Sequence, residues 1–237
     1  VKMSPTDRLL PPSLEHPFGT DQLGRDVMTR VLYGGRLSLP MGIAPIAVAA
    51  LAGLFLGLVS GYFGGWLDLV LMRVVDVWIA FPPILLALAV VTILGTGLTN
   101  IMIALGIAWI PYYARMVRGS VLEAKHRVYV DAARALGGMD LRIVLRHVLP
   151  NVLTPILVMS SMGVANAILA GAALSFLGLG AQAPAPEWGT SLADARQFIR
   201  LGWWVGLFPG LAIAVTVLGA NLMGDGLRDA LDPKLKI

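Results

Sequence analysis

The 237-residue sequence contains no cysteine, which excludes disulfide bonds and thiol catalysis. It has three histidines, which stand too far apart in the sequence to suggest a structural metal site; they are His16, His126 and His147. Charged residues are scarce as well, at 14% of the chain against about 25% in an average soluble domain. This is too little charge for a surface in contact with water, so we expect a protein that is embedded in lipid.

Apolar residues, by contrast, are plentiful: they make up 57% of the chain, and the mean hydropathy is +0.78. A helix needs roughly 20 mostly apolar residues to cross the hydrocarbon core of a bilayer, which is about 30 Å thick. Five segments meet this requirement, so the sequence predicts an all-α membrane protein that forms a multi-span helical bundle. They are approximately Leu37–Ser60, Leu69–Leu94, Gly97–Ala114, a charge-free stretch between Pro150 and Pro186, and Leu201–Gly224.

The net charge of +4 is concentrated in a single segment between the third and the fourth of these spans. Its seven basic residues outnumber its three acidic ones; they are Arg115, Arg118, Lys125, Arg127, Arg134, Arg142 and Arg146 against Glu123, Asp131 and Asp140. An excess of lysine and arginine is typical of cytoplasmic loops. We therefore expect a transmembrane domain over residues 37–237, with a cytoplasmic loop at 115–149, and an extracytoplasmic segment at residues 1–36.

This orientation leaves three arginines close to the first span on the extracytoplasmic side, namely Arg25, Arg30 and Arg36. The positive-inside rule disfavours that placement. The sequence also begins with Val1 and has no apolar run before Leu37 that could carry the segment across the membrane. We therefore expect one further span upstream of Val1.

The cytoplasmic loop carries the pattern of a helix that begins at its centre. Ser120 and Glu123 have the spacing of a capping box, which predicts that the helix starts at Ser120. Apolar residues recur along it at helical spacing, and charges alternate on the other side; the apolar set is Leu122, Tyr129, Ala133 and Leu136, and the charged set is Glu123, Arg127, Asp131 and Arg134. The pair Gly137-Gly138 is expected to end the helix.

A second, shorter helix is predicted over Leu141–His147, and Pro150 should stop it. Two short amphipathic helices joined at a glycine corner can insert into a groove on another protein. They can equally lie flat on a surface of anionic lipid. The residues by themselves leave both interpretations open. In either case, Asp131 can act simply as one member of the charged face, between Arg127 and Arg134.

Part of this loop resembles a known motif. Asp131-Ala132-Ala133, followed by Gly137 and then by Leu149-Pro150, is similar to the Glu-Ala-Ala loop of ABC-importer permeases. Asp131 stands where that family usually has glutamate, and His147 stands where it usually has isoleucine. The resemblance implies that the loop forms coupling helices that dock in a cleft of an ATP-binding subunit. The residues it assigns to docking are Tyr129, Asp131, Ala132, Ala133, Leu136, Gly137 and Gly138.

A second resemblance runs from residue 16 to the C-terminal end. The segment His16–Asp26, with Tyr33-Gly-Gly-Arg36 after it, is similar to the segment before the second span of the dipeptide/oligopeptide/nickel permeases. It matches the C-type subunit, whose partner is a homologous second permease subunit. The resemblance implies six spans, one of them before His16, in a bacterial or archaeal cytoplasmic (inner) membrane. It also implies import of dipeptides or oligopeptides, with nickel or glutathione as alternative substrates.

Further partners follow from the same resemblance: two ATP-binding subunits, which bind ATP and Mg²⁺ outside this chain, and an extracytoplasmic substrate-binding protein. The sequence has no Gly-x-x-x-x-Gly-Lys phosphate loop, and we expect no catalysis, cofactor or nucleic-acid partner here. A secondary transporter is the alternative class, but it would show internal repeats, and we find none. An intramembrane hydrolase would need paired catalytic groups within the spans, and Asp76 has no acidic companion there.

Polar residues within the spans each need a reason, because an ionisable group costs ~2.5 kcal/mol or more at the bilayer centre. Arg73 and Asp76 lie three residues apart on one face of the second predicted span. They form either a gate or subunit contact, or an interfacial ion pair. Asn166 and Asn221 are expected to hydrogen-bond between helices or to line the translocation path.

Overall fold

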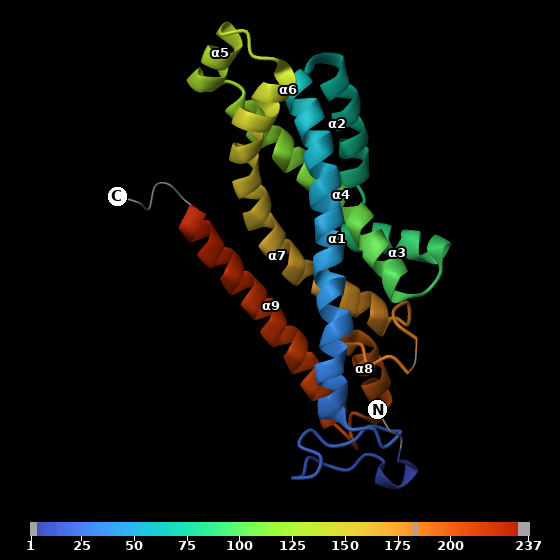
Figure 1. Ribbon diagram of the computed structural model, residues 1–237. Helices are drawn as coiled ribbons and strands as arrows, with labels where there is room; N and C mark the ends of the chain where they lie inside the picture. The colour runs from blue at the N-terminus through green and yellow to red at the C-terminus, as the bar shows by residue number, and fades with distance from the viewer. Residues whose placement is uncertain (1–3, 183, 232–237) are drawn as a thin grey trace.

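The computed structural model describes residues 4–182 and 184–231, and these residues fold into a bundle of helices (Figure 1). No β-strand occurs in this part of the chain, so the prediction of an all-α protein is confirmed. The elements are η1 (Pro5–Asp7), α1 (Val27–Phe63), α2 (Gly65–Ile79), α3 (Pro83–Leu94), α4 (Leu98–Ala124), α5 (Val128–Ala135), α6 (Asp140–Ile143), η2 (Val144–Val148), α7 (Leu149–Phe176), α8 (Trp188–Ala195), η3 (Arg196–Phe198) and α9 (Trp204–Leu231).

Four helices are long and apolar enough to cross a membrane: α1, α4, the continuous helix Asp140–Phe176, and α9. The pair α2 and α3 adds a fifth crossing if it counts as one span, but the two helices are bent by 88° relative to each other. The predicted span Leu69–Leu94 is therefore present as a broken pair of helices rather than as one continuous helix. Pro82 and Pro83 explain the break, because a proline in a helix lacks the N–H donor and clashes with the carbonyl one turn earlier.

α1 is longer than the first predicted span, since it begins at Val27 rather than at Leu37. Asp26 starts it: its carboxylate accepts a hydrogen bond from the backbone N–H of Thr29 at 2.7 Å, which satisfies a free donor of the first turn. With 37 residues, α1 is about 55 Å long, whereas the hydrocarbon layer is about 30 Å thick. α1 therefore projects well beyond the apolar layer.

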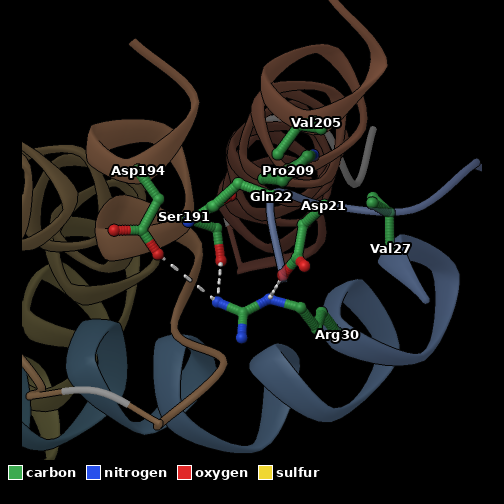
Figure 2. Close-up of a pocket in the computed structure, with 8 residues that line it drawn as sticks. All are labelled: Asp21, Gln22, Val27, Arg30, Ser191, Asp194, Val205 and Pro209. Atoms are coloured by element: carbon green, nitrogen blue, oxygen red, sulfur yellow. Dashed lines mark hydrogen bonds and ion pairs between the residues drawn. The ribbon is translucent and has the colours of Figure 1, made fainter. Parts of the chain in front are cut away.

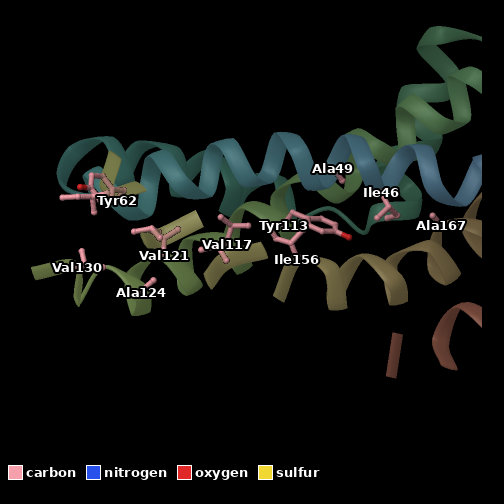
Figure 3. Packing of buried hydrophobic residues seen from close by; sticks show 13 residues of the cluster. Ile46, Ala49, Tyr62, Tyr113, Val117, Val121, Ala124, Val130, Ile156 and Ala167 are labelled. Atoms are coloured by element: carbon pink, nitrogen blue, oxygen red, sulfur yellow. The ribbon is translucent and has the colours of Figure 1, made fainter. Parts of the chain in front are cut away.

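α1 and α4 pack side by side because glycines on α1 face larger side chains on α4. A Cβ atom on Gly53 would lie 2.3 Å from the Cβ of Tyr113, and one on Gly57 would lie 2.6 Å from the Cβ of Val117. Only glycine lets the two backbones approach this closely. Tyr113 and Val117 are fully buried, and the apolar cluster that contains them continues through Val121 toward the loop after α4 (Figure 3).

α4 continues past the third predicted span and ends at Ala124. The prediction that a new helix begins at Ser120 is therefore wrong: Ser120 lies inside α4, where its hydroxyl donates to the carbonyl of Met116 at 3.3 Å. The helix continues because Val117 and Val121 remain fully buried against α1 beyond the apolar end of the span. Tertiary contacts thus override the local capping signal.

Pro150 does not stop the second helix of the loop. α6 leads through the π-helical segment η2 into α7, and the helix continues to Phe176. The π-helical turn, which is looser than an α-helical turn, ends directly before Leu149 and Pro150. The side chain of Asn151 donates to the carbonyl of His147 at 2.7 Å. The prediction is wrong because the π-helical turn accommodates the proline that would clash in a regular helix.

The two ends of the bundle carry different structures (Figure 1). Residues 4–26, called here the N-terminal residues, lie with α8 at one end, and α5 and α6 lie at the other. The predicted topology requires residues 1–36 and the basic loop to lie on opposite sides of the membrane, and this arrangement separates them by the length of α1. Which side each end faces stays a prediction.

Candidate docking loop and polar clusters at both ends

The loop between α4 and α7 turns at a glycine corner, as predicted. Gly137 has a φ of +80°, a conformation that side chains rarely adopt, and it directly follows the last turn of α5. The backbone N–H of Gly138 donates to the carbonyl of Ala133 at 3.0 Å. A Cβ atom on Gly138 would lie 2.8 Å from that same oxygen. Both glycines are therefore needed for the sharp turn from α5 to α6.

Two side chains fasten this corner to the bundle. Val130 of α5 and Ile143 of α6 are almost fully buried, and they belong to the apolar cluster that includes residues of α1 and α4. Figure 3 shows Val130 at one end of this cluster. Most other large apolar residues of the loop point away from the protein; the exposed set is Val128, Tyr129, Leu136, Met139, Leu141 and Leu145. Leu136 is the extreme case, with 89% of its surface exposed. A group of exposed apolar side chains of this kind marks an interaction site.

The predicted docking residues are therefore brought together on one corner. Tyr129, Asp131, Ala132, Leu136 and Gly137 are exposed. The other two, Ala133 and Gly138, are half-buried and form the inner side of the corner. The expected stripe is interrupted, since Leu122 belongs to α4 and the other three members belong to α5 and its end.

The charged face of α5 forms the expected pairs. Arg127 pairs with Glu123, and Arg134 lies 3.4 Å from Asp131, with all four side chains more than half exposed. Asp131 therefore does act as one member of this charged face, through its contact with Arg134. Because exposed ion pairs contribute only about 0–1 kcal/mol, Asp131 can exchange Arg134 for a partner on another subunit at little cost.

The loop begins well past the first charged residue of α4. Arg115 is the first charged residue of α4, and the helix runs on for nine residues to Ala124, which is about 14 Å at 1.5 Å per residue. The headgroup layer on each side of a bilayer is about 5–8 Å thick. α5 and α6 follow after Ala124, and the chain then returns through η2 to α7. Docking on a protein partner and a flat position on lipid both stay predictions.

Two hydrogen bonds tie the loop to the end of α1. The hydroxyl of Tyr62 donates to Oδ1 of Asp140 at 2.6 Å, and Nζ of Lys125 donates to the carbonyl of Gly61 at 2.8 Å. Both ends of the loop segment thus hold the same turn of α1. The helical periodicity of the sequence did not predict these contacts, because Tyr62 and Asp140 are 78 residues apart.

A second polar cluster joins the start of α2 to α4. The carboxylate of Asp68 accepts two hydrogen bonds from Arg118, from Nε at 2.5 Å and from an NH2 group at 2.6 Å. It also accepts one from the hydroxyl of Ser60 on α1. Bidentate arginine–carboxylate pairs are the strong, geometrically fixed ones. The turn between α1 and α2 is therefore locked to the same part of α4 that carries the loop.

The expected pair of Arg73 with Asp76 does not form. Asp76 pairs instead with Arg115 of α4, and about half of each of these side chains is exposed. Arg73 is exposed on α2. The interfacial ion pair thus exists with a different partner, because α4 lies against the face of α2 that carries Asp76. A role of Arg73 and Asp76 as a gate or subunit contact stays a prediction.

Asn166 is exposed on α7, and Asn221 is half-buried on α9. Within the described residues neither side chain hydrogen-bonds to another helix, so the expected bond between helices is not formed inside this chain. Lining the translocation path remains a prediction for both asparagines.

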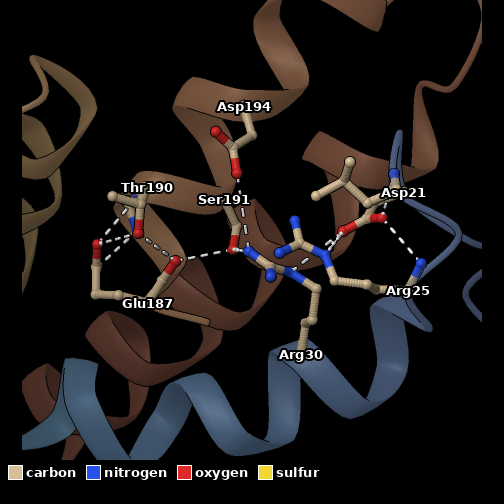
Figure 4. Close-up of polar contacts among 9 residues, drawn as sticks. Asp21, Arg25, Arg30, Glu187, Thr190, Ser191 and Asp194 are labelled. Atoms are coloured by element: carbon tan, nitrogen blue, oxygen red, sulfur yellow. Dashed lines mark hydrogen bonds and ion pairs between the residues drawn. The ribbon is translucent and has the colours of Figure 1, made fainter. Parts of the chain in front are cut away.

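At the opposite end, buried charges connect the N-terminal residues to α1 (Figure 4). Asp21 and Arg25 are almost fully buried, and Nε of Arg25 donates to Oδ2 of Asp21 at 2.6 Å. Arg30, which is buried as well, lies 3.6 Å from the same carboxylate oxygen and 3.9 Å from Asp194 of α8. It also donates to the hydroxyl of Ser191 at 3.2 Å. Buried charges need such partners to remain ionised.

These contacts account for two arginines that break the positive-inside rule. Arg25 and Arg30 are paired with carboxylates inside the protein, so they do not act as free positive charges beside the membrane. Next to them, burial raises the pKa of the Asp26 carboxyl, but hydrogen bonds from Thr29 and His16 outweigh this effect and hold that pKa below its usual value. Whether a further span precedes Val1 stays a prediction.

The hollow beside Arg30 is too small for a ligand (Figure 2). Its volume is about 10 Å³, which is the size of one water molecule. The residues that line it include Asp21, Gln22, Ser191 and Asp194. The polar contacts around this hollow thus hold the N-terminal residues and α8 in place. Among the described residues there is also no group of three metal-ligating side chains.

Comparison with known proteins agrees with this architecture. The family model described as binding-protein-dependent transport system inner membrane component matches residues 53–237. The dipeptide transport system permease protein DppC of Alkalihalophilus pseudofirmus is 51% identical over 236 residues, which cover 100% of this chain and 78% of the relative. The glutathione transport system permease protein GsiD of Pectobacterium atrosepticum is 50% identical over 225 residues, covering 95% of this chain and 75% of the relative.

Solved structures show the same fold. A chain of the MetNI methionine ABC transporter in an inward-facing conformation has a TM-score of 0.71 at 19% identity, covering 87% of this chain and 98% of that chain. A chain of an amino acid ABC transporter solved with histidines has a TM-score of 0.65 at 16% identity, covering 86% of this chain and 95% of that one. The predicted resemblance of the bundle to an ABC-importer permease is thereby confirmed for the fold.

Proposed function

The chain belongs to the family of binding-protein-dependent transport system inner membrane components, and from that premise we propose that it forms half of the translocation pathway of an ATP-driven importer for peptide-type substrates. Its partners in this proposal are a homologous second permease subunit, two ATP-binding subunits and an extracytoplasmic binding protein. ATP and Mg²⁺ bind to the ATP-binding subunits, so ATP is hydrolysed outside this chain. The membrane is the inner membrane of a bacterium.

The observation that carries the proposal is the position of the α5–α6 corner. It projects about 14 Å past the first charged residue of α4 and exposes apolar side chains there, Leu136 above all. A leucine side chain exposed to water buries no apolar surface. When the same side chain enters a groove on another protein, its apolar surface is buried and the contact is stabilised. The two hydrogen bonds to the end of α1 then pass a movement of the corner to α1.

The opposite end supports a meeting point with the binding protein. There the N-terminal residues are held against α1 and α8 by the buried pairs of Asp21, Arg25 and Arg30. A surface built from two distant segments is fixed in shape by such pairs, and a fixed surface binds a rigid partner with less loss of entropy. We place the docking of the binding protein on this end.

The substrate in this proposal is a dipeptide or a short oligopeptide. One relative of about half identity is named as a dipeptide permease and another as a glutathione permease, and glutathione is itself a short peptide. Nickel is a weaker candidate for this chain, because the described residues contain no cluster of metal ligands.

The test is to co-express the chain with the second permease, the ATP-binding subunits and the binding protein, and to reconstitute the complex in vesicles. We expect the ATP-binding subunits to co-purify, and dipeptides or glutathione to raise the rate of ATP hydrolysis while nickel alone does not. A chain that purifies without ATP-binding subunits under mild conditions would refute the proposal.

A matched pair of variants locates the docking site. Leu136→Asp puts a charge on the exposed corner, and Leu14→Asp makes the same change at a fully exposed position in the N-terminal residues. We expect Leu136→Asp to lose the ATP-binding subunits and Leu14→Asp to retain them. Equal retention by both variants would exclude the corner as the docking site.

A further inference from the structure

A hollow of about 240 Å³ lies on the inner side of the α5–α6 corner. Its walls come from the end of α5, from Gly138, and from the helix that follows; the lining residues are Ala133, Leu136, Gly138, Arg142, Ile143, Arg146 and His147. Three of the seven are basic. The ring of His147 lies beside the ring of Tyr129, with centroids 6.2 Å apart. α5 therefore also borders the hollow next to His147.

The positive charge in this hollow is not neutralised within the described part of the chain. No carboxylate there lies within ion-pair distance of Arg142 or Arg146. The acidic residues of the loop are engaged elsewhere: Asp131 pairs with Arg134, Glu123 pairs with Arg127, and Asp140 accepts the hydroxyl of Tyr62. The hollow therefore has two arginines whose hydrogen-bond donors are open to a partner.

We propose that this hollow, called here the basic hollow, receives an acidic side chain of the ATP-binding subunit. The inference rests on the proposed function and adds a second, polar contact to the apolar one at Leu136. Two guanidinium groups on one helix, four residues apart, can hold a single carboxylate by charge-assisted hydrogen bonds. The small walls at Ala133 and Gly138 leave room for the incoming side chain.

A protein carboxylate fits this place better than a lipid phosphate does. Besides its basic residues, the hollow is lined by the apolar and small residues Ala133, Leu136 and Gly138 of α5 and the corner. It is also a recess between two helices of the loop. An exposed apolar rim at Leu136 next to a basic recess is the composition of a protein interface.

Charge reversal in the assembled complex tests the proposal. Arg142→Glu and Arg146→Glu put an acid into the hollow, and Arg228→Glu makes the same change at an exposed arginine near the end of α9, outside the hollow. We expect each hollow variant to weaken binding of the ATP-binding subunits at least about tenfold, and Arg228→Glu to leave binding unchanged. Assembly with the second permease subunit serves as the check on folding for all three variants.

The second arm identifies the partner. Aspartate and glutamate residues on the ATP-binding subunit are changed one at a time to lysine, and each is combined with Arg146→Glu. We expect one such change to restore binding, because it re-creates an opposite-charge pair. If Arg142→Glu and Arg146→Glu bind as the wild type does while Leu136→Asp loses binding, the basic hollow is refuted and the docking corner stands.

A third arm distinguishes a lipid headgroup from a protein carboxylate as the group that binds in the basic hollow. Binding is measured in detergent without lipid, in neutral phosphatidylcholine vesicles, and in vesicles that contain phosphatidylglycerol. We expect the loss caused by Arg146→Glu in all three. A loss that occurs only with phosphatidylglycerol would assign the hollow to a headgroup and overturn the proposal.

Discussion

The hydroxyl of Tyr62, next to the last residue of α1, donates a hydrogen bond to Asp140, the first residue of α6, at 2.6 Å. This bond connects the second half of the docking loop to the helix that crosses the whole bundle. Lys125 donates to the neighbouring carbonyl of Gly61, so both ends of the loop are tied to the end of α1. We expect these contacts to transmit a displacement of the corner to α1.

Removing this bond should uncouple the loop from α1. Tyr62→Phe deletes the hydroxyl and keeps the ring, at an expected cost of about 0.5–1.5 kcal/mol in stability. We expect substrate-stimulated ATP hydrolysis by the reconstituted complex to fall toward the unstimulated rate, with assembly unchanged. Asp140→Ala should behave in the same way, whereas Asp140→Asn keeps an acceptor oxygen and should stay near wild type. Full stimulation in Tyr62→Phe would show that the bond carries no signal.

A second prediction concerns the close approach of α1 and α4. Gly53→Ala places a Cβ atom 2.3 Å from the Cβ of Tyr113, so the helices must separate. We expect a loss of about 1–3 kcal/mol in stability, seen as a lower melting temperature of the purified protein. Gly219→Ala is the control, because a Cβ atom there meets nothing within 4 Å. Equal melting temperatures for the two variants would mean that the helices are not in contact at Gly53.

A third prediction concerns the buried charges near α8. Arg25→Ala removes the 2.6 Å partner of the buried Asp21 carboxylate, and because Arg30 remains 3.6 Å away, the cost should lie below the ~3–5 kcal/mol typical of a fully broken buried pair. We expect the N-terminal residues to detach, with faster hydrogen exchange in residues 16–26 and in α8. Arg36→Ala removes an exposed arginine that lies over the ring of Tyr33, and it should leave exchange unchanged. Unaltered exchange in Arg25→Ala would contradict the proposed role of this pair.

The cap of α1 should make stability depend on pH. Because the folded pKa of Asp26 lies below its usual value of about 3.9, its ionised form adds stability above that pH, and the contribution is lost as the pH falls through the lowered pKa. The variant Asp26→Asn has no carboxyl to titrate at this position, yet asparagine still caps a helix. Its melting temperature should therefore fall less than that of the wild type between pH 5 and acid conditions, roughly pH 3. Parallel curves would contradict the assignment.

The sequence predicted those features that depend on neighbouring residues or on hydrophobic length. α5 ends before Gly137 because the chain turns there with φ near +80°. Glycine adopts this conformation more readily than other residues, and this preference belongs to the residue itself rather than to distant contacts. The apolar spans were likewise found from length alone, except that Pro82 and Pro83 bend the second one by 88°. The corner of the docking loop was therefore expected at the right residues.

Features that depend on distant contacts were missed or misplaced. Ser120 had the spacing of a helix start, but the buried contacts of Val121 with α1 carry α4 through it. Asp76 was matched to Arg73 on the same helix, whereas α4 supplies Arg115 from 39 residues away. No local pattern contains such information, because it arises only when the helices pack.

Docking at the corner is tested most directly with single cysteines, because the sequence has none of its own. Leu136→Cys and Leu14→Cys each introduce one thiol at an exposed position, at opposite ends of the bundle. In cells, a short heterobifunctional reagent that joins a thiol to a lysine amine should cross-link the cysteine at position 136 to an ATP-binding subunit, and a membrane-impermeant maleimide should label only the cysteine at position 14. Labelling of position 136 from outside the cell, together with no cross-link to an ATP-binding subunit, would contradict the claim that this loop docks the importer's ATPase.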